Sequence, residues 1–439
     1  MSYNDKKLIA IFTILPSEHS GIAIYSYSLV NELKKYYDIH IFTNKLSCEC
    51  QDDVHSHFCF LTLSKKYHYD AIIYQVGNQE SFAFLYPYLI YYPGIAVLHD
   101  IYLYQSRAKY LISKKRFKEY VDEMYYCHGY TGKKFAELSL KFPIPEIMGF
   151  AFAMNKLLID CSLAVGVHTK FYQEYLSFHY PNKQIYYIPM SIGSIDSEYL
   201  TSSVPKVFYQ KDDEQLLLGS AGYANMHKGL SNILKALVEV SKEFNVKFIW
   251  IGEDKDKLIE SILSKNFTQQ ERSILDNRIL ITGYLKDEEF ITLLNKINIF
   301  LNLRYPTAGE FSGVLWLAMH LGKPIIMSDE PHLAEIPNEY VCKIKLDNEA
   351  YSLAEKLFFL LRNPIKRQIL GTLIKKYAEE NYSIDKTINA YRLIIEQSKF
   401  DWHLSSQSMK LPYHCMPLSL NKLFTEFTEW ELSILRSLF

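Results

Sequence analysis

Three residues that could do chemistry together, Arg304, Gly309 and Glu310, lie between a short apolar run and a longer one. The first run, 299–303, has the composition of a β-strand, and the second, 311–321, has helical length and is closed by a glycine and a proline. A second apolar strand follows at once, so the pattern predicts a βαβ unit. In such a unit the ligand site lies beyond the first strand, where the helix N-terminus favours an anion such as a diphosphate. An ordinary unit with a surface glutamate in its first helical turn fits the spacing equally well, and the residues alone leave both interpretations open.

Polar residues also follow several predicted strands in the first half of the chain. They are Asn78 after residues 70–76, His99 and Asp100 after residues 95–98, and His168 after residues 163–167. In a doubly wound parallel sheet these strand ends share one edge, so we expect the side chains to line one cleft. The pattern thus predicts α/β architecture in this half too.

The rhythm of strand and helix fades between residues 188 and 215 and then restarts. We therefore expect an N-terminal domain at 1–195, a linker at 196–213, a C-terminal domain at 214–399 and an extension at 400–439. Apolar residues recur at helical spacing in the extension, which suits packing against its own domain or, secondarily, a homo-oligomer contact. Two α/β halves joined by one linker suggest a ligand cleft between them.

Composition excludes several classes of protein. The 48 basic and 49 acidic residues leave a net charge of -1, so we expect no nucleic acid partner. Seven scattered cysteines, an odd number, argue for a reducing compartment. Neither a signal peptide nor a membrane span is recognisable, so a cytoplasmic protein is expected. The basic segment 107–124 is predicted to form one helix. Its basic face is expected to be solvated, and the alternative is that it docks peripherally on an anionic membrane.

Three stretches together resemble the retaining glycosyltransferases of family 4, which have the GT-B fold of two facing Rossmann-like domains. They are SGIAIYS, YQVGNQ followed by PGIAVLHD, and NLRYPTAGEFSGVLWLAMHLGKPIIMSD. Weaker matches are VGVHTK, GYANMHKG and ITGYLKDEEF, and the resemblance covers roughly residues 6 to 396. It implies transfer of a sugar from a nucleotide-diphosphate sugar to a hydroxyl acceptor such as a saccharide or glycan, as in polysaccharide biosynthesis. It also implies that the C-terminal domain mainly binds the nucleotide-sugar and the N-terminal domain mainly binds the acceptor.

The resemblance also implies residue roles. Glu310 would accept hydrogen bonds from the donor sugar, Lys228 would neutralise the diphosphate, and His99 would lie close to the reacting carbon. Asn78, Asp100 and His168 could serve the acceptor side. The full set expected at the donor site, which includes Tyr223 and Arg304 from the positions discussed next, is Gly21, Gly222, Tyr223, Lys228, Tyr284, Leu285, Arg304, Glu310, Phe311, Ser312 and Gly313.

Two positions depart from the family pattern. Leu317 stands where the family has a second glutamate that contacts ribose, and Tyr223 stands where an arginine commonly follows the glycine of the phosphate loop. A departing diphosphate needs its charge stabilised, and loss of a cation there should cost several kcal/mol of barrier. We expect Arg304 to supply that cation, because a planar guanidinium suits phosphate oxygens.

No metal or other cofactor is expected. Asp254 and Asp256 form an Asp-x-Asp pair, which in another transferase fold holds a divalent cation, but here lysines lie between and beside them. We interpret them as the start of a solvated helix. Two alternatives to an active transferase remain open: a GT-B nucleotide-sugar epimerase or phosphorylase, and a catalytically silent subunit of a glycosylation complex.

Overall fold

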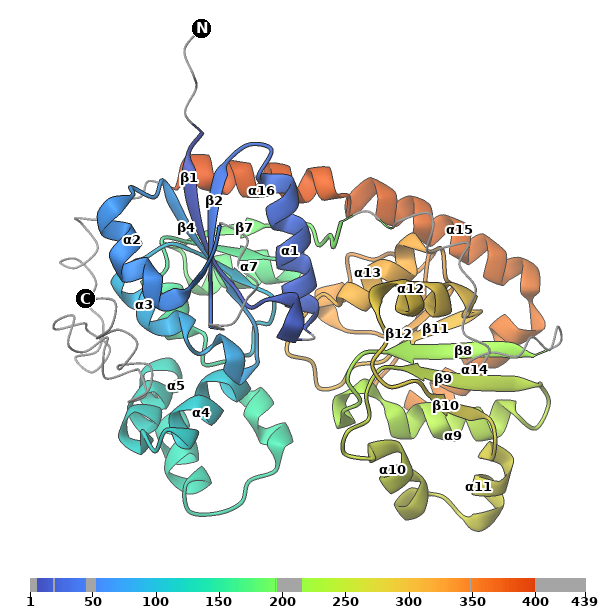
Figure 1. The fold of residues 1–439 in the computed structure, drawn as a ribbon. Coiled ribbons are helices and arrows are strands. Elements are labelled where there is room, and N and C mark those ends of the chain that lie inside the picture. Colours follow the sequence, from blue (N-terminus) through green and yellow to red (C-terminus); the bar gives the residue numbers. More distant parts are fainter. Residues whose placement is uncertain are drawn as a thin grey trace, which may run out of the picture. The chain divides into compact units, whose positions relative to one another are not determined.

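The computed structural model describes residues 6–18, 20–44, 53–193, 195, 215–347 and 349–398. Contacts divide the chain into two units (Figure 1). The first unit holds the described residues of Met1–Gly193, Ala308–Phe311 and Ile384–Phe439, and the second holds those of Ser194–Thr307 and Ser312–Ser383. The predicted linker at 196–213 and the predicted extension at 400–439 lie outside the described residues.

The first unit contains a seven-stranded sheet in the order β3-β2-β1-β4-β5-β6-β7, and every neighbouring pair is parallel. Its strands are β1 (Leu8–Phe12), β2 (Asp38–Thr43), β3 (Val54–Ser56), β4 (Ala71–Val76), β5 (Ile95–Leu98), β6 (Ala164–Val167) and β7 (Gln184–Tyr187). Its helices are α1 (Gly21–Leu33), α2 (Phe60–Lys66), α3 (Leu85–Tyr91), α4 (Tyr104–Ser113), α5 (Phe117–Ser139), α6 (Lys156–Cys161), α7 (Lys170–His179) and α16 (Ile384–Gln397).

Aromatic side chains fill much of the core under this sheet. The ring of Phe12, in β1, lies 4.9 to 5.0 Å from the rings of Phe42, Phe60, Tyr74 and Tyr88. All five are fully buried. Their packing fixes the sheet to the helices on one of its faces, because aromatic rings at these separations contribute beyond simple burial.

The second unit contains a six-stranded parallel sheet in the order β10-β9-β8-β11-β12-β13. Its strands are β8 (Leu216–Ala221), β9 (Val246–Ile251), β10 (Ile279–Ile281), β11 (Ile299–Asn302), β12 (Ile325–Ser328) and β13 (Cys342–Ile344). Its helices are α9 (Leu230–Val240), α10 (Leu258–Asn266), α11 (Gln269–Leu275), α12 (Asp287–Lys296), α13 (Gly313–His320), α14 (Glu349–Arg362) and α15 (Pro364–Asn381).

The predicted βαβ unit is formed by β11, α13 and β12. Residues Leu315 to Met319 of α13 are all buried, as expected for a helix with apolar residues on every side. The prediction of doubly wound parallel sheets in both halves is confirmed. No helix in the described part of the chain is long and apolar enough to cross a membrane.

Two predicted helices differ from the structure. The segment 107–124 is not one helix but parts of α4 and α5, because Lys115 adopts a left-handed conformation with φ of 57°. Arg107 is also not solvated: its guanidinium is buried and bonds both carboxylate oxygens of Glu123 at 2.9 Å. The exposed basic residues of this region are lysines.

The C-terminal domain was predicted to run to residue 399, but α16 packs within the first unit. On its buried face, Thr387 donates a hydrogen bond to the carbonyl of Pro189 at 2.6 Å. Tyr391 bonds the side chains of Tyr25 and Gln75, both at 3.0 Å. A helix attached to the end of one unit thus completes the core of the other.

Candidate functional site

The carboxyl ends of β4, β5 and β6 bring predicted polar residues to one edge of the first sheet. These strands are adjacent and parallel. Asn78 lies two residues after β4, His99 directly follows β5, and His168 directly follows β6. The structure therefore brings these three predicted residues to the same edge, next to the switch point where β1 and β4 pair.

His99 lies at the centre of a buried hydrogen-bond network. Its Nδ1 is 3.1 Å from Nε2 of His168, and its Nε2 is 2.8 Å from the side-chain amide of Gln75. The same amide reaches the hydroxyl of Tyr391 at 3.0 Å, and Tyr25 donates to that hydroxyl at 3.0 Å. Both ring nitrogens of His99 are thus engaged by the protein.

Burial keeps both histidines neutral. Burial, reinforced by the adjacent His168, holds the pKa of His99 well below its usual value. Burial also lowers the pKa of His168 to about 4, although the bond to the carbonyl of Ile188 opposes this change. Neither imidazole ring is positively charged near neutral pH.

The neutral state fixes the direction of every bond in the network. The Ile188 carbonyl, 3.0 Å from Nδ1 of His168, can only accept, so Nε2 of His168 accepts from Nδ1–H of His99. The structure places the amide oxygen of Gln75 2.8 Å from Nε2 of His99 and its NH₂ 3.0 Å from the Tyr391 hydroxyl. A neutral His99 needs a donor at Nε2, which requires this amide to be turned over so that its NH₂ bonds His99 and its oxygen bonds Tyr391. The result is a rigid polar chain in which each member has one role.

Asn78 and Asp100 connect two loops of the same edge. A carboxylate oxygen of Asp100 accepts from the backbone N–H of Asn78 at 2.7 Å. The side-chain oxygen of Asn78 accepts from the backbone N–H of Ser106, in α4, at 3.0 Å. These bonds give both residues a positioning role in the loops that follow β4 and β5.

Gly21 begins α1, and the hydroxyl of Ser20 accepts from the backbone N–H of Ile22 to cap that helix. A Cβ added at Gly21 would meet no atom within 4 Å. The packing of the described residues therefore does not require glycine at this position. Space for a closely approaching ligand is a sufficient reason for it.

Glu310 lies in the short segment Ala308–Phe311, which belongs to the first unit. The carbonyl of Ala308 accepts from the backbone N–H groups of Ile101 at 2.7 Å and Tyr102 at 3.0 Å. Gly309 has φ of 82°, and a Cβ there would lie 2.7 Å from the hydroxyl of Tyr172. Glycine is required at this position, and it holds the half-buried Glu310 beside residues that follow β5.

In the second unit, Lys228 is held at the carboxyl end of β8. Its ammonium group donates to the carbonyl of Ala221 at 3.0 Å and lies 5.4 Å above the ring of Trp250. Gly222 has φ of 102°, and a Cβ there would lie 2.4 Å from the same ammonium. The glycine thus makes room for the cation, at the switch point where β8 pairs with β11.

Arg304 follows β11 and reaches the N-terminus of α13. Its guanidinium donates to the side chain of Asn302 at 3.3 Å and to the hydroxyl of Ser312 at 2.8 Å. Ser312 is the N-cap of α13, whose first residue is Gly313, and its hydroxyl also accepts from the backbone N–H of Leu315. A cation and the positive end of a helix dipole lie together here, and a bound anion would be attracted by both.

Tyr223 does not replace the missing arginine as a cation. Its side chain is 45% exposed, and its hydroxyl donates to a carboxylate oxygen of Asp256 at 3.2 Å. The neighbouring Asp254 accepts from the backbone N–H groups of Leu258 and Ile259 at 2.7 and 3.0 Å. Asp254 therefore caps α10, in agreement with the interpretation as a helix start. Among the described residues no group of three potential metal ligands occurs.

Two further predicted donor residues follow β10 at the same edge of the second sheet. Tyr284 is 54% exposed and Leu285 is buried. The preceding loop is tied to β9, because the backbone N–H of Gly252 donates to the hydroxyl of Thr282 at 3.2 Å. Leu317, at the position of the family's second glutamate, is buried in α13.

Sequence reasoning missed the partners of His99, namely Gln75, Tyr25 and Tyr391. Gln75 is a fully buried polar residue in an otherwise apolar strand. A buried amide requires hydrogen-bond partners, so this exception to the apolar run was a usable signal. The two tyrosines carried no comparable signal.

Comparison with known proteins shows what this chain is similar to. Residues 215–363 match the family model described as "Glycosyl transferases group 1". An uncharacterized glycosyltransferase of Methanocaldococcus jannaschii is 25% identical over 294 residues, which are 66% of this chain and 71% of the relative. The chain therefore resembles group 1 glycosyltransferases, through the family match in its second half and through this distant relative.

Solved structures show the fold of this chain. Sucrose-phosphate synthase of Thermosynechococcus elongatus superposes with a TM-score of 0.62 at 15% identity, covering 89% of this chain and 99% of that chain. HepE of Anabaena, solved with UDP and glucose, superposes with a TM-score of 0.54 at 13% identity, covering 89% and 98%. The predicted GT-B class with two Rossmann-like parallel-sheet domains is confirmed.

Proposed function

We propose that this protein is a retaining glycosyltransferase that moves a sugar from a nucleotide-diphosphate sugar to a hydroxyl of a saccharide or glycan, without a metal ion. The observation that carries the proposal is the fixed cation of Lys228, held at the switch point of the second sheet by the Ala221 carbonyl and the Trp250 ring. Arg304, beside the N-terminus of α13, supports it as a second diphosphate ligand. The binding of UDP and glucose by HepE makes UDP-sugars the first donors to test.

The reaction we propose breaks the bond between the anomeric carbon and the diphosphate oxygen. As positive charge develops on the sugar, the departing diphosphate gains negative charge, which Lys228 and Arg304 stabilise. The acceptor hydroxyl attacks from the face that the diphosphate leaves and gives its proton to a diphosphate oxygen. No carboxylate nucleophile is required, unlike in retaining glycoside hydrolases. Glu310 contributes hydrogen bonds to the donor sugar.

A catalytically silent subunit is the second candidate, and two observations favour it. Leu317 offers no polar atom for the ribose, and the Tyr223 hydroxyl bonds Asp256 instead of providing a cation. The retained Lys228 weighs against it. A silent subunit would still bind a nucleotide diphosphate but would not turn over a donor.

Calorimetry followed by turnover assays tests the proposal. We expect UDP or another nucleoside diphosphate to bind, and the matching nucleotide-sugar to be hydrolysed slowly without acceptor and transferred with one. The Lys228→Met variant should lose turnover by about 100-fold or more, as expected for a lost charge-stabilising group. Lys235→Met, which removes an exposed lysine from α9, is the matched control and should behave like the wild type.

Three results would contradict the proposal. Binding without turnover would indicate the silent subunit. Recovery of epimerised nucleotide-sugar from a donor incubated alone would indicate an epimerase. Equal turnover of Lys228→Met and Lys235→Met would remove the observation on which the proposal rests.

A further inference from the structure

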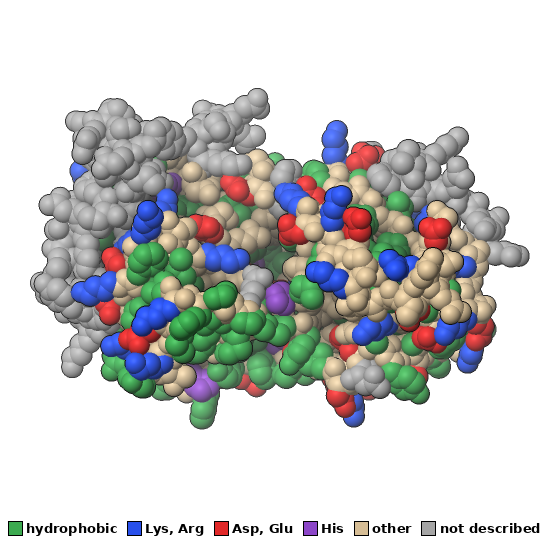
Figure 2. Space-filling model, turned by 90° about the horizontal axis from the view of Figure 1, so that it is seen from below, with side chains coloured by type: hydrophobic (Ala, Val, Ile, Leu, Met, Phe, Trp, Pro, Cys, Tyr) green, Lys and Arg blue, Asp and Glu red, His purple; other side chains and the backbone are tan. Residues whose placement is uncertain are grey.

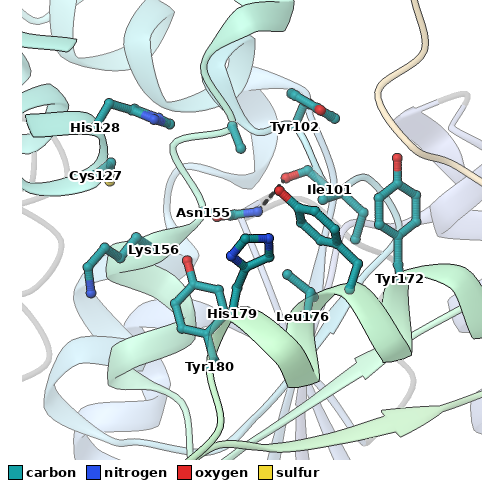
Figure 3. Close-up of a pocket in the computed structure, with 12 residues that line it drawn as sticks. Ile101, Tyr102, Cys127, His128, Asn155, Lys156, Tyr172, Leu176, His179 and Tyr180 are labelled. Carbon is teal, nitrogen blue, oxygen red and sulfur yellow. Dashed lines mark hydrogen bonds between the residues drawn. The ribbon is translucent and has the colours of Figure 1, made fainter. Parts of the chain in front are cut away.

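The first unit contains a cavity of about 330 Å³ next to α7 (Figure 3). It lies between α7, the end of the 101–102 loop, the start of α6 and residues 127–128 of α5. All of these segments belong to one unit. The volume lies within the range of small-molecule sites.

Aromatic rings form much of the cavity wall. Tyr172, Tyr175 and Tyr180 line it from α7 and the residue after it, and Tyr102 faces them from the loop. Tyr175 is 45% exposed, and its ring lies 4.3 Å from that of His179. On the face drawn in Figure 2, hydrophobic side chains gather over the first unit, whereas charged side chains are spread across both. Tyrosines in such a wall offer an apolar face together with a hydroxyl.

Polar groups in the wall can exchange hydrogen bonds with hydroxyls. Asn155 is only 7% exposed, and its amide N–H donates to the carbonyl of Ile101 at 2.9 Å. No hydrogen-bond donor among the described residues reaches the side-chain oxygen of Asn155. Nε2 of His128 accepts from the backbone N–H of Met154 at 3.0 Å, and burial lowers the pKa of His128, so its proton lies on Nδ1. The wall therefore has an acceptor and a donor, which hydroxyl groups match.

The cavity wall has little uncompensated charge. Lys156 is a cation in the wall, but its ammonium group pairs with Asp160 at 2.5 Å. Among the described residues that line the cavity there is no aspartate or glutamate. A charged ligand in this cavity would find no unpaired side chain of opposite charge among the described residues of its wall, and a charge without a partner is unfavourable in a partly buried site.

One end of the cavity adjoins the segment that carries Glu310. Ile101 and Tyr102 line the cavity, and their backbone N–H groups donate to the carbonyl of Ala308. From Tyr172, which faces Gly309, to Tyr180 the helix rises about 12 Å. The cavity thus extends away from Glu310 over a length greater than a single sugar ring.

We propose that this cavity binds the acceptor, and that the acceptor is an uncharged saccharide of at least two sugar rings. One ring lies at the Ile101 and Tyr102 end, near Glu310, and the next stacks on Tyr175. The hydroxyls bond Asn155 and His128. This inference rests on the proposed transferase function, whose acceptor it specifies.

Binding of defined sugars to the full chain tests the cavity directly. Saturation-transfer NMR would use neutral disaccharides of gluco, galacto and manno configuration, with glucose as the single-ring probe and glucose 6-phosphate as the anionic probe. We expect a neutral disaccharide to bind more tightly than either of these. Tyr175→Ala should weaken that binding about tenfold, the size of one lost aromatic stacking contact. Phe178→Ala is the matched control, because Phe178 lies on the same helix, is 81% exposed and does not line the cavity.

The outcomes separate this proposal from the proposed function. If no neutral disaccharide binds, if glucose 6-phosphate binds best, or if Tyr175→Ala and Phe178→Ala behave alike, the cavity is not the acceptor site. Calorimetry with UDP and donor hydrolysis assess the transferase function independently. Disaccharide binding that depends on Tyr175 in a chain that neither binds nor hydrolyses any donor would refute the transferase and leave a saccharide-binding cavity.

Discussion

Acid should weaken the first unit through its buried histidines, and His168 allows the size of the effect to be worked out. Burial lowers the pKa of His168 from 6.5 to about 4. Below pH 6.5 the unfolded chain gains a proton at this residue, whereas the folded protein stays neutral until about pH 4. Stability is therefore full above pH 6.5 and falls as the pH drops toward 4. Between pH 6.5 and about pH 5 this residue alone should remove about 1.6 kcal/mol from the free energy of unfolding.

The assay must report on the first unit alone. The two tryptophans in the described part of the chain, Trp250 and Trp316, lie in the second unit, so fluorescence is unsuitable. Amide hydrogen exchange of peptides covering β4 and β5, corrected for its intrinsic pH dependence, measures the right free energy. His168→Gln cannot titrate, so the stability that it lacks relative to wild type should shrink by about 1.6 kcal/mol between pH 6.5 and about pH 5. If both proteins lose stability in parallel, His168 does not stay neutral in the folded state and the network described above is wrong.

Four further perturbations address the donor side and the metal requirement. Gly222→Ala places a Cβ 2.4 Å from the Lys228 ammonium and should weaken the affinity for UDP, measured by calorimetry, at least about tenfold. An unchanged affinity would show that the ammonium is free to shift. Gly21→Ala meets no atom and should leave the melting temperature unchanged; lower turnover would then reflect the approach of the ligand. Arg304→Ala should reduce turnover about 100-fold with Arg304→Lys intermediate, and full activity would exclude a role for its guanidinium. Treatment with a chelator such as EDTA should leave turnover unchanged, and loss restored by Mg²⁺ would contradict the metal-free mechanism.

The βαβ unit could be predicted from sequence because its signals are local. An apolar strand, turn residues and an apolar helix closed by Gly322 and Pro324 fix β11, α13 and β12 almost to the residue. The polar residues after β4, β5 and β6 were equally predictable, because strand ends in a parallel sheet must share an edge. Local chemistry was therefore sufficient to place Asn78, His99 and His168 together.

The remaining features depend on contacts distant in sequence. The apolar face of α16 shows that the helix is buried but does not specify the sheet it packs against, and so its Tyr391 could not be paired with Gln75, 316 residues away. The break between α4 and α5 was missed because Lys115 takes a left-handed conformation that non-glycine residues rarely adopt. The cavity beside α7 combines four separate segments, and no periodicity in any one of them encodes its shape.

The hydrogen bonds of His99 bear on the chemistry itself. A general base needs a nitrogen lone pair directed at the substrate, but Nδ1 of His99 is hydrogen-bonded to His168 and its Nε2 to the side chain of Gln75. Its low pKa also makes it a poor proton acceptor near neutral pH. While the network is intact, His99 cannot take the proton of an acceptor hydroxyl. That proton must therefore go to another group. In the proposed reaction this group is the departing diphosphate, which Lys228 and Arg304 attract and whose basicity increases as its bond to the sugar breaks. The buried network around His99 and the absence of a protein base in the proposed mechanism are therefore consistent with each other: His99 shapes the edge of the first sheet, and the substrate carries the proton.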